Sequence, residues 1–210
     1  MSTNVKRGIS FILGLFILSF GISLTILSRL GAGAWDALNV GLSNLTRTAI
    51  AGWTIFTVGH WVIVVGIILI FINAILLKKK PEFIAMITVF IIGYFIDFWL
   101  IIVFPNFYPA TFIWQLIVLL IGVVLMGFGI ATYLQAKFAI IPIDRLMMAI
   151  QFRLKVSLMV GKTIAEVTAL IFAFIFGGPI GIGTVIVTFS IGPLIQVFFP
   201  HLEKWVHGYN

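Results

Sequence analysis

The sequence contains little charge and no cysteine. Only 9% of its 210 residues are charged, against about a quarter in an ordinary soluble domain. Apolar residues make up 62% of the chain. This composition argues against a water-soluble enzyme and a disordered chain, and the absence of Cys excludes a disulfide-stabilised scaffold. The absence of Cys does not indicate a cellular compartment, because proteins without Cys occur in every compartment.

Long apolar runs take up most of the chain. A helix crosses the hydrocarbon core of a bilayer with about 20 mostly apolar residues. Six segments meet this requirement: residues 9–27, 53–77, 83–104, 112–134, 158–176 and 183–199. We therefore predict an all-α fold in a single membrane domain over residues 1–210. A cleaved signal peptide is the less favoured interpretation of the first run, since that run is too long and more spans follow.

The basic residues predict the orientation. Lys and Arg accumulate in cytoplasmic loops. With a cytoplasmic N-terminus, all 13 Lys and Arg except Arg29 and Arg47 fall on the cytoplasmic side, and the C-terminus is cytoplasmic too. The formal charge of +7 is therefore interpreted as a topology signal. Nucleic acid is not an expected partner, because the charges lie at helix ends and form no basic face.

The two halves of the sequence resemble each other at an offset of 108 residues. The aligned pairs include Gly14 with Gly122, Asp36 with Asp144, and Leu38 with Leu146. The repeats cover about residues 8–104 and 112–200, and each contains three predicted spans. Three is odd, so the second repeat is expected to cross the membrane in the inverted sense. Inverted repeats are typical of many secondary transporters, although channels also have them and a duplication alone does not require transport.

Each repeat also contains one amphipathic helix too short to span, predicted at residues 34–47 and 142–155. Such a helix lies flat at the interface or dips into the protein as a re-entrant helix, and we favour the re-entrant form. Asp36 and Asp144 occupy matching places in the first turns of these helices. There a carboxylate stabilises the positive helix end, or it contributes to a binding site, and both interpretations stay open.

Ionisable residues within apolar spans are costly and are therefore functional candidates. Glu166 lies about two turns into the fifth span, Asp97 lies late in the third, and His60 is in the second. Lys162 precedes Glu166 by one helical turn, so the two side chains are placed to pair. A buried, hydrogen-bonded carboxyl group with only a structural role is the alternative for each acid.

Several segments resemble those of bacterial YczE/YitT-type integral membrane proteins. They are residues 31–38 (Gly-Ala-Gly-Ala-Trp-Asp-Ala-Leu), 142–146 (Pro-Ile-Asp-Arg-Leu), 181–184 and 191–196. The family usually has Gly-Pro-Trp-Asp in the first motif, where this chain has Ala34 at the Pro position, whereas the second copy retains Pro142. The resemblance implies a multi-pass protein of the bacterial cytoplasmic membrane. It implies no substrate, because the family has no settled biochemical activity.

These observations predict a small secondary transporter or permease for a small polar or charged solute, without enzymatic activity, cofactor or metal site. The predicted solute site consists of Trp35, Asp36, Asn39, Asp144 and Arg145. Glu166 and Asp97 are the predicted groups for proton or ion coupling. The main alternative is a non-transporting scaffold or accessory subunit that acts through a protein partner, followed by a membrane-embedded lipid enzyme and a channel. Whether the chain forms a homo-oligomer is left open.

Overall fold

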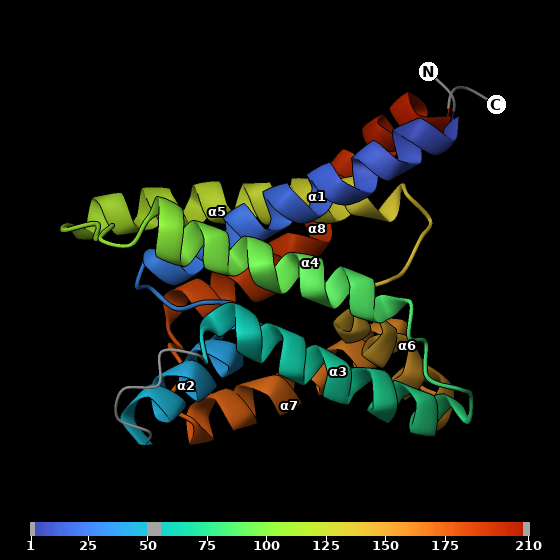
Figure 1. Ribbon diagram of the computed structural model, residues 1–210, viewed down its shortest axis with the longest axis horizontal. Coiled ribbons are helices and arrows are strands. Elements are labelled where there is room, and N and C mark those ends of the chain that lie inside the picture. The colour runs from blue at the N-terminus through green and yellow to red at the C-terminus, as the bar shows by residue number, and fades with distance from the viewer. Residues whose placement is uncertain (1–2, 50–55, 208–210) are drawn as a thin grey trace. The chain divides into compact units, whose positions relative to one another are not determined.

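The computed structural model describes residues 3–49 and 56–207, and the regular structure in these residues is entirely helical (Figure 1). The helices are α1 (Thr3–Leu27), α2 (Ala34–Ala49), α3 (Val58–Leu77), α4 (Ala85–Asp97), α5 (Phe112–Leu134), α6 (Pro142–Leu154), α7 (Leu158–Ile175) and α8 (Ile182–His207), and α4 continues into the π-helical turn η1 (Phe98–Val103). Six helical segments are long and apolar enough to cross a membrane, namely α1, α3, α4 with η1, α5, α7 and α8. The predicted all-α fold with six candidate membrane spans is therefore confirmed in the described residues.

The helix bounds differ from the predicted spans mainly at three ends. Part of the predicted start of the second span, residues 53–55, lies outside the described residues, and α3 begins at Val58 because the side chain of Thr57 accepts a hydrogen bond from the backbone N–H of His60. α1 starts at Thr3 instead of residue 9. α8 runs to His207 instead of 199 and contains both Pro193 and Pro200. Hydropathy locates the part of a helix that lies in lipid, whereas its ends depend on capping and on polar turns outside the lipid.

The helices form two compact units whose composition differs from that of the two sequence repeats. α1, α5, α8 and η1 belong to the first unit. The second unit contains α2, α3, α6, α7 and the greater part of α4. Each unit thus takes helices from both halves of the sequence, and each is described separately below.

Antiparallel packing of α1 on α5 is the main contact of the first unit. A Cβ atom on Gly129 would lie 2.9 Å from the carbonyl oxygen of Gly14, and one on Gly122 would lie 2.9 Å from that of Gly21. Only glycine allows the two backbones to approach this closely. The four glycines are related by the sequence repeat, because adding 108 to 14 and 21 gives 122 and 129.

The first unit also brings together the start of α1 and the end of α8. The Nζ of Lys6 donates a hydrogen bond to the carbonyl oxygen of Trp205 at 3.0 Å, and the same ammonium group lies 6.0 Å from the centre of the Trp205 ring. Gln135, which is fully buried, donates to the carbonyl oxygen of Phe199. These contacts place the beginning of α1 and the end of α8 side by side.

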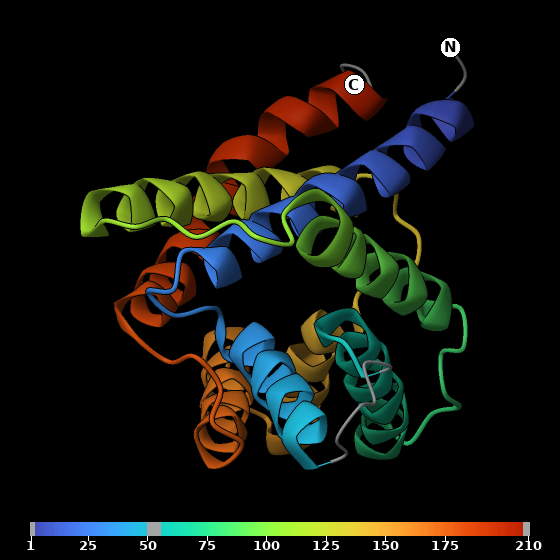
Figure 2. The ribbon, with the colours of Figure 1, turned by 60° about the vertical axis from the view of Figure 1, so that its left-hand side comes forward.

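The second unit is built around α3 and α7, each of which packs against both short helices, α2 and α6 (Figures 1 and 2). Small residues allow the close contacts of α7. Ala165, Ala169 and Ala173 form one fully buried stripe along it, and Gly161 lies against the backbone of Met147 in α6. Just after α7, a Cβ atom on Gly178 would lie only 2.2 Å from the carbonyl oxygen of Ala37 in α2.

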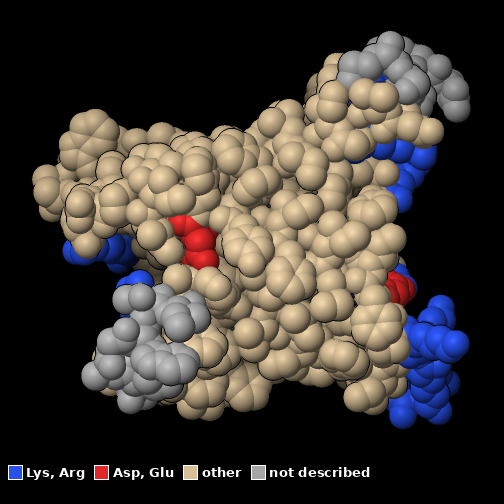
Figure 3. Space-filling view, viewed as in Figure 1, with Lys and Arg blue, Asp and Glu red and all other residues tan. Residues whose placement is uncertain are grey.

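The surface is largely uncharged, as a lipid-facing surface should be. Uncharged side chains cover nearly all of the face drawn in Figure 3, and Lys and Arg gather at its margins. Large apolar side chains such as Ile102, Phe174 and Phe189 are at least 70% exposed. Exposed apolar groups on long helices match a hydrocarbon solvent.

Candidate functional site

The short helix α2 carries a buried polar stripe. Trp35, Asn39 and Ser43 are spaced by four residues, which places them on one face of the helix, and each is less than a tenth exposed. The Ser43 hydroxyl donates to the carbonyl oxygen of Phe56 at 3.0 Å. In contrast, the Nε1 atom of Trp35 and the Oδ1 atom of Asn39 are buried without a hydrogen-bond partner. An unsatisfied buried polar atom costs about 1–3 kcal/mol, so these atoms are suited to meet a ligand or a water molecule.

Burial changes along the length of α2. Residues 34–43 are buried or nearly so, whereas four of the five residues 44–48 are exposed. An interfacial helix would instead bury one face along its whole length. The same change occurs in α6, where residues 142–147 are at least partly buried and residues 151–154 are all exposed. Each short helix therefore buries its N-terminal end and exposes its C-terminal end.

Asp36 lies in the buried first turn of α2, outside the six apolar spans. Burial, and after it the negative charge of Glu166, raises the pKa of Asp36 from an ordinary value of 3.8 to about 7. A carboxyl group with such a pKa can bind and release a proton near neutral pH.

Asp144 has the equivalent place in α6, on the third residue of the helix. The residue that caps α6 is Ile141, which has no side chain able to cap, and Pro142 occupies the first helical position. Asp144 is thus not the N-cap of its helix. Its carboxylate also acts electrostatically on Glu166.

Glu166 connects the two short helices electrostatically. It lies in α7, which packs against both α2 and α6, and it interacts with Asp36 of α2 and Asp144 of α6. Lys162, one turn earlier in α7, acts on Glu166 with a positive charge. The second unit therefore contains three carboxyl groups, on three helices, that are linked electrostatically through Glu166, and Lys162 acts on Glu166 with the opposite charge. We call Asp36, Asp144, Glu166 and Lys162 the acidic cluster.

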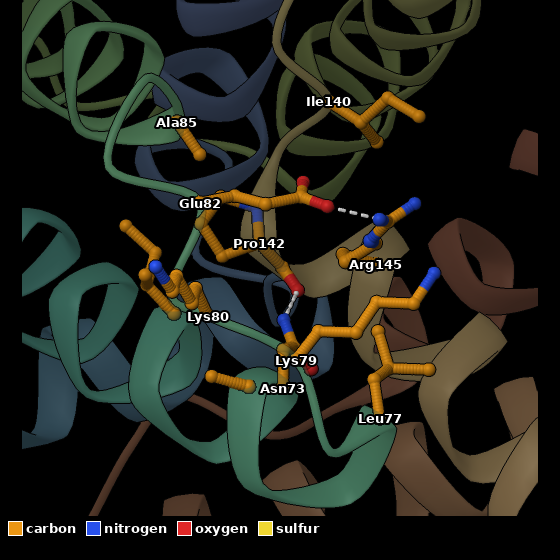
Figure 4. A pocket seen from close by; sticks show the side chains of 11 residues that line it. Asn73, Leu77, Lys79, Lys80, Glu82, Ala85, Ile140, Pro142 and Arg145 are labelled. Atoms are coloured by element: carbon orange, nitrogen blue, oxygen red, sulfur yellow. Dashed lines mark hydrogen bonds and ion pairs between the residues drawn. The ribbon is translucent and has the colours of Figure 1, made fainter.

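A small pocket lies beside α6, between its first turn and the connection from α3 to α4 (Figure 4). Arg145 of α6 forms an ion pair with Glu82 of that connection. Asn73 of α3, only 5% exposed, donates from Nδ2 to the carbonyl oxygen of Pro142 at 2.9 Å. Lys79 and Lys80 also line the pocket, whose cavity volume is about 20 Å³. We call it the α6 pocket.

The comparisons with known proteins identify the family. The profile of the "Family of unknown function (DUF6198)" matches residues 5–200. The chain belongs to this family. It is 43% identical over 192 residues to the "Uncharacterized protein YyaS" of Bacillus subtilis, a match that covers 91% of this chain and 92% of that protein. No solved structure matches the chain.

Two further relatives of this DUF6198 member cover nearly the same length. The "Uncharacterized membrane protein YczE" of Bacillus subtilis is 33% identical over 199 residues, which are 93% of this chain and 86% of that protein. An "Uncharacterized protein" of Haemophilus influenzae is 31% identical over 206 residues, which are 98% of this chain and 89% of that protein. The resemblance to YczE-type membrane proteins is thus confirmed, and the chain is an integral membrane protein.

In this DUF6198 member, the structure brings most of the predicted site residues into one unit. Trp35, Asp36, Asn39, Asp144 and Arg145, the whole predicted solute site, belong to the second unit together with Glu166. Within that set, Arg145 faces the α6 pocket, while Asp36 and Asp144 interact with Glu166. Asp97, the other predicted coupling residue, ends α4 and belongs to the first unit. The functional roles of all these residues remain predictions.

Sequence reasoning gave no role to Asn73 and Glu82. Asn73 interrupts an apolar run near its end, and this polar residue was a visible signal. Glu82 follows three lysines in a connection, where nothing in the sequence indicates its partner. His60 has a local role: its Nδ1 atom lies within hydrogen-bond distance of the Thr57 hydroxyl at the start of α3. Among the described residues, no group of three His, Cys, Asp or Glu is arranged to hold a metal ion.

Proposed function

We propose that this protein is a secondary transporter for a small polar or charged solute and that its acidic cluster carries the coupling proton or cation. The observation that supports the proposal best is the electrostatic interaction of Glu166 with both Asp36 and Asp144. Ionisable residues within membrane helices mark ion and substrate pathways by default. Three electrostatically linked carboxyl groups are more than the first turns of two helices require, and the N-cap of α6 is Ile141.

The architecture of the proposed transporter follows from the packing of the two halves. The antiparallel contact of α1 with α5 pairs residues that the sequence repeat interchanges. α2 packs on α7, and α3 packs on α6 in the corresponding way. These reciprocal contacts support two inverted repeats, a plan whose binding sites lie between the repeats near the middle of the membrane.

We further propose that α2 and α6 are re-entrant helices that enter the protein from opposite sides of the membrane. Their buried N-terminal ends and exposed C-terminal ends support this placement over one flat on the membrane surface. The unsatisfied atoms of Trp35 and Asn39 would then be contacts for the solute. Lys6 donates a hydrogen bond to the carbonyl oxygen of Trp205, which agrees with both termini lying on the same side of the membrane. The distribution of basic residues assigns that side to the cytoplasm.

Coupled transport has a direct test in proteoliposomes that contain the purified full-length chain. Solutes from a fixed panel of amino acids, carboxylic acids and primary amines are added on one side, and charge movement is recorded on a solid-supported membrane. We expect at least one solute class to produce a current in the wild type and in Glu203→Gln, and none in Glu166→Gln. Glu203 is the matched control, because it is an exposed glutamate near the end of α8.

The opposite outcome would count against transport. The protein must first be shown to remain folded and monodisperse. If no solute of the panel then produces a current or binds to it, the proposal of coupled transport is wrong for these solute classes. A scaffold or accessory subunit would then be the better interpretation. Equal currents in Glu166→Gln and the wild type would retain transport but remove Glu166 from the coupling site.

A further inference from the structure

The α6 pocket differs from the acidic cluster in the sign of its charge. Three basic side chains, Lys79, Lys80 and Arg145, line it with one carboxylate, Glu82. Three positive charges against one negative charge leave a net charge of +2. Figure 4 shows these side chains around the first turn of α6, where the free backbone N–H groups of a helix also favour an anion.

Two buried polar atoms at the α6 pocket have no partner within the protein. The Nε atom of Arg145 is buried without a hydrogen-bond acceptor, because the ion pair with Glu82 uses the Nη2 atom instead. The Oδ1 atom of Asn73 is likewise buried without a donor. An Arg donor group left over in a pocket with two lysines is suited to an oxyanion.

The place of the pocket in the chain puts it at a membrane boundary. α3 ends at Leu77, and α4 begins at Ala85, so the connection between two membrane-spanning helices forms one wall of the pocket. Ile70 and Leu77 give the pocket an apolar side. In the same connection, Phe83 and Ile84 are more than half exposed and would lie against lipid. Phosphate groups of phospholipids are found at this depth, between apolar chains and water.

We propose that the α6 pocket binds a phosphate group, presented by the headgroup of an anionic phospholipid. The phosphate would accept hydrogen bonds from the Nε of Arg145 and from the ammonium groups of Lys79 and Lys80, while Asn73 Oδ1 would accept from a headgroup hydroxyl. A cavity volume of about 20 Å³ holds about one or two water-sized groups, so it would receive phosphate oxygens while the rest of the headgroup stays outside, and it is too small for a whole organic solute. Basic pockets between membrane helices recognise anionic lipid headgroups in this way. This site is separate from the proposed transport function.

The pocket is tested by the thermal unfolding of the delipidated full-length protein in detergent, followed by the fluorescence of its six Trp residues. Dioctanoyl phosphatidylglycerol, dioctanoyl phosphatidylcholine and inorganic phosphate are titrated separately. We compare the wild type with Lys79→Gln/Lys80→Gln and with Arg153→Gln/Lys155→Gln. The second double variant removes the same charge from the exposed C-terminal end of α6, outside the pocket.

We expect phosphatidylglycerol to raise the unfolding temperature of the wild type and of Arg153→Gln/Lys155→Gln at similar concentrations. Lys79→Gln/Lys80→Gln should require at least about tenfold more of the lipid, since two charge-assisted contacts are lost. Phosphatidylcholine, which has no net charge, should act only at much higher concentration. Arg145→Lys, which keeps the charge but removes Nε–H, should also weaken the response.

Other results separate the sources of the phosphate or overturn the proposal. A response to inorganic phosphate that is lost in Lys79→Gln/Lys80→Gln would support the pocket with a free anion as its ligand. Equal weakening in both double variants would show general surface attraction and would overturn the proposal. The proposal would also be overturned if phosphatidylcholine raised the unfolding temperature as much as phosphatidylglycerol does. It would likewise be overturned if the folded wild type responded to none of the three compounds.

Discussion

Asp144 and Arg145 are neighbours in the first turn of α6, yet they act on different partners. The carboxylate of Asp144 interacts with Glu166 in α7, whereas the guanidinium of Arg145 pairs with Glu82 in the connection between α3 and α4. Successive residues on a helix point about 100° apart, so one turn can serve two sites. The same turn of α6 thus contributes to the acidic cluster on one side and to the α6 pocket on the other.

Asp36 and Asp144 should be required for coupled solute transport and dispensable for folding. Asp36→Asn and Asp144→Asn keep the size of the side chain and remove its charge, and we expect each to abolish solute-induced currents in proteoliposomes. Size-exclusion profiles and helix content should match the wild type. Wild-type currents in both variants would remove these two residues from the site.

Stability should fall as the pH rises towards 7, because of Asp36. Its pKa is about 7 in the folded chain and about 3.8 in the unfolded chain, so the folded state holds the proton more tightly. Between pH 5 and 7 this group alone should lower the free energy of unfolding by about 2 kcal/mol, and little more above pH 7. Unfolding temperatures in detergent at pH 5, 6, 7 and 8 provide the measurement.

The matched control for this pH dependence is Asp36→Asn, which removes the titrating group. Its unfolding temperature should depend less on pH than that of the wild type, and the two curves should approach each other at low pH. An identical pH dependence in both proteins would contradict the assigned role of Asp36.

Gly178 should tolerate no side chain. A Cβ atom there would lie 2.2 Å from the carbonyl oxygen of Ala37, and backbone atoms cannot give way as a flexible side chain does. We expect Gly178→Ala to lower the free energy of unfolding by about 1–3 kcal/mol. Gly192→Ala is the control, because nothing lies within 4 Å of a Cβ atom at Gly192 in α8. Equal unfolding temperatures for the two variants would argue against the close packing of α2 on the segment after α7.

The exposed ends of the two short helices should lie on opposite sides of the membrane. The chain has no Cys, so Arg47→Cys and Arg153→Cys each introduce a single thiol at an exposed position, in α2 and α6 respectively. A membrane-impermeant maleimide should label Arg47→Cys in intact cells and Arg153→Cys only after permeabilisation. Labelling of both from the same side would rule out the inverted repeats.

Most of the fold followed from the sequence because lipid imposes strict rules. An apolar run of about 20 residues in a membrane has almost no alternative to a helix, and the predicted span at 112–134 coincides with α5. The amphipathic spacing likewise predicted α2 from Ala34 and α6 from Pro142. The start of α3 at Val58 and the end of α8 at His207 were not predicted, because caps and polar turns carry no hydropathy signal.

For the candidate site, the sequence identified the residues but not their neighbours. Composition, charge and the 108-residue offset determined a multi-pass helical protein with matching acids at Asp36 and Asp144, since these properties are written along the chain. Only the tertiary structure decided that Glu166 interacts with both acids and that Glu82 pairs with Arg145. The physical reason is that electrostatic partners are chosen by distance in space. Residues 82 and 145 are far apart in the chain, and they meet because α3 packs against α6.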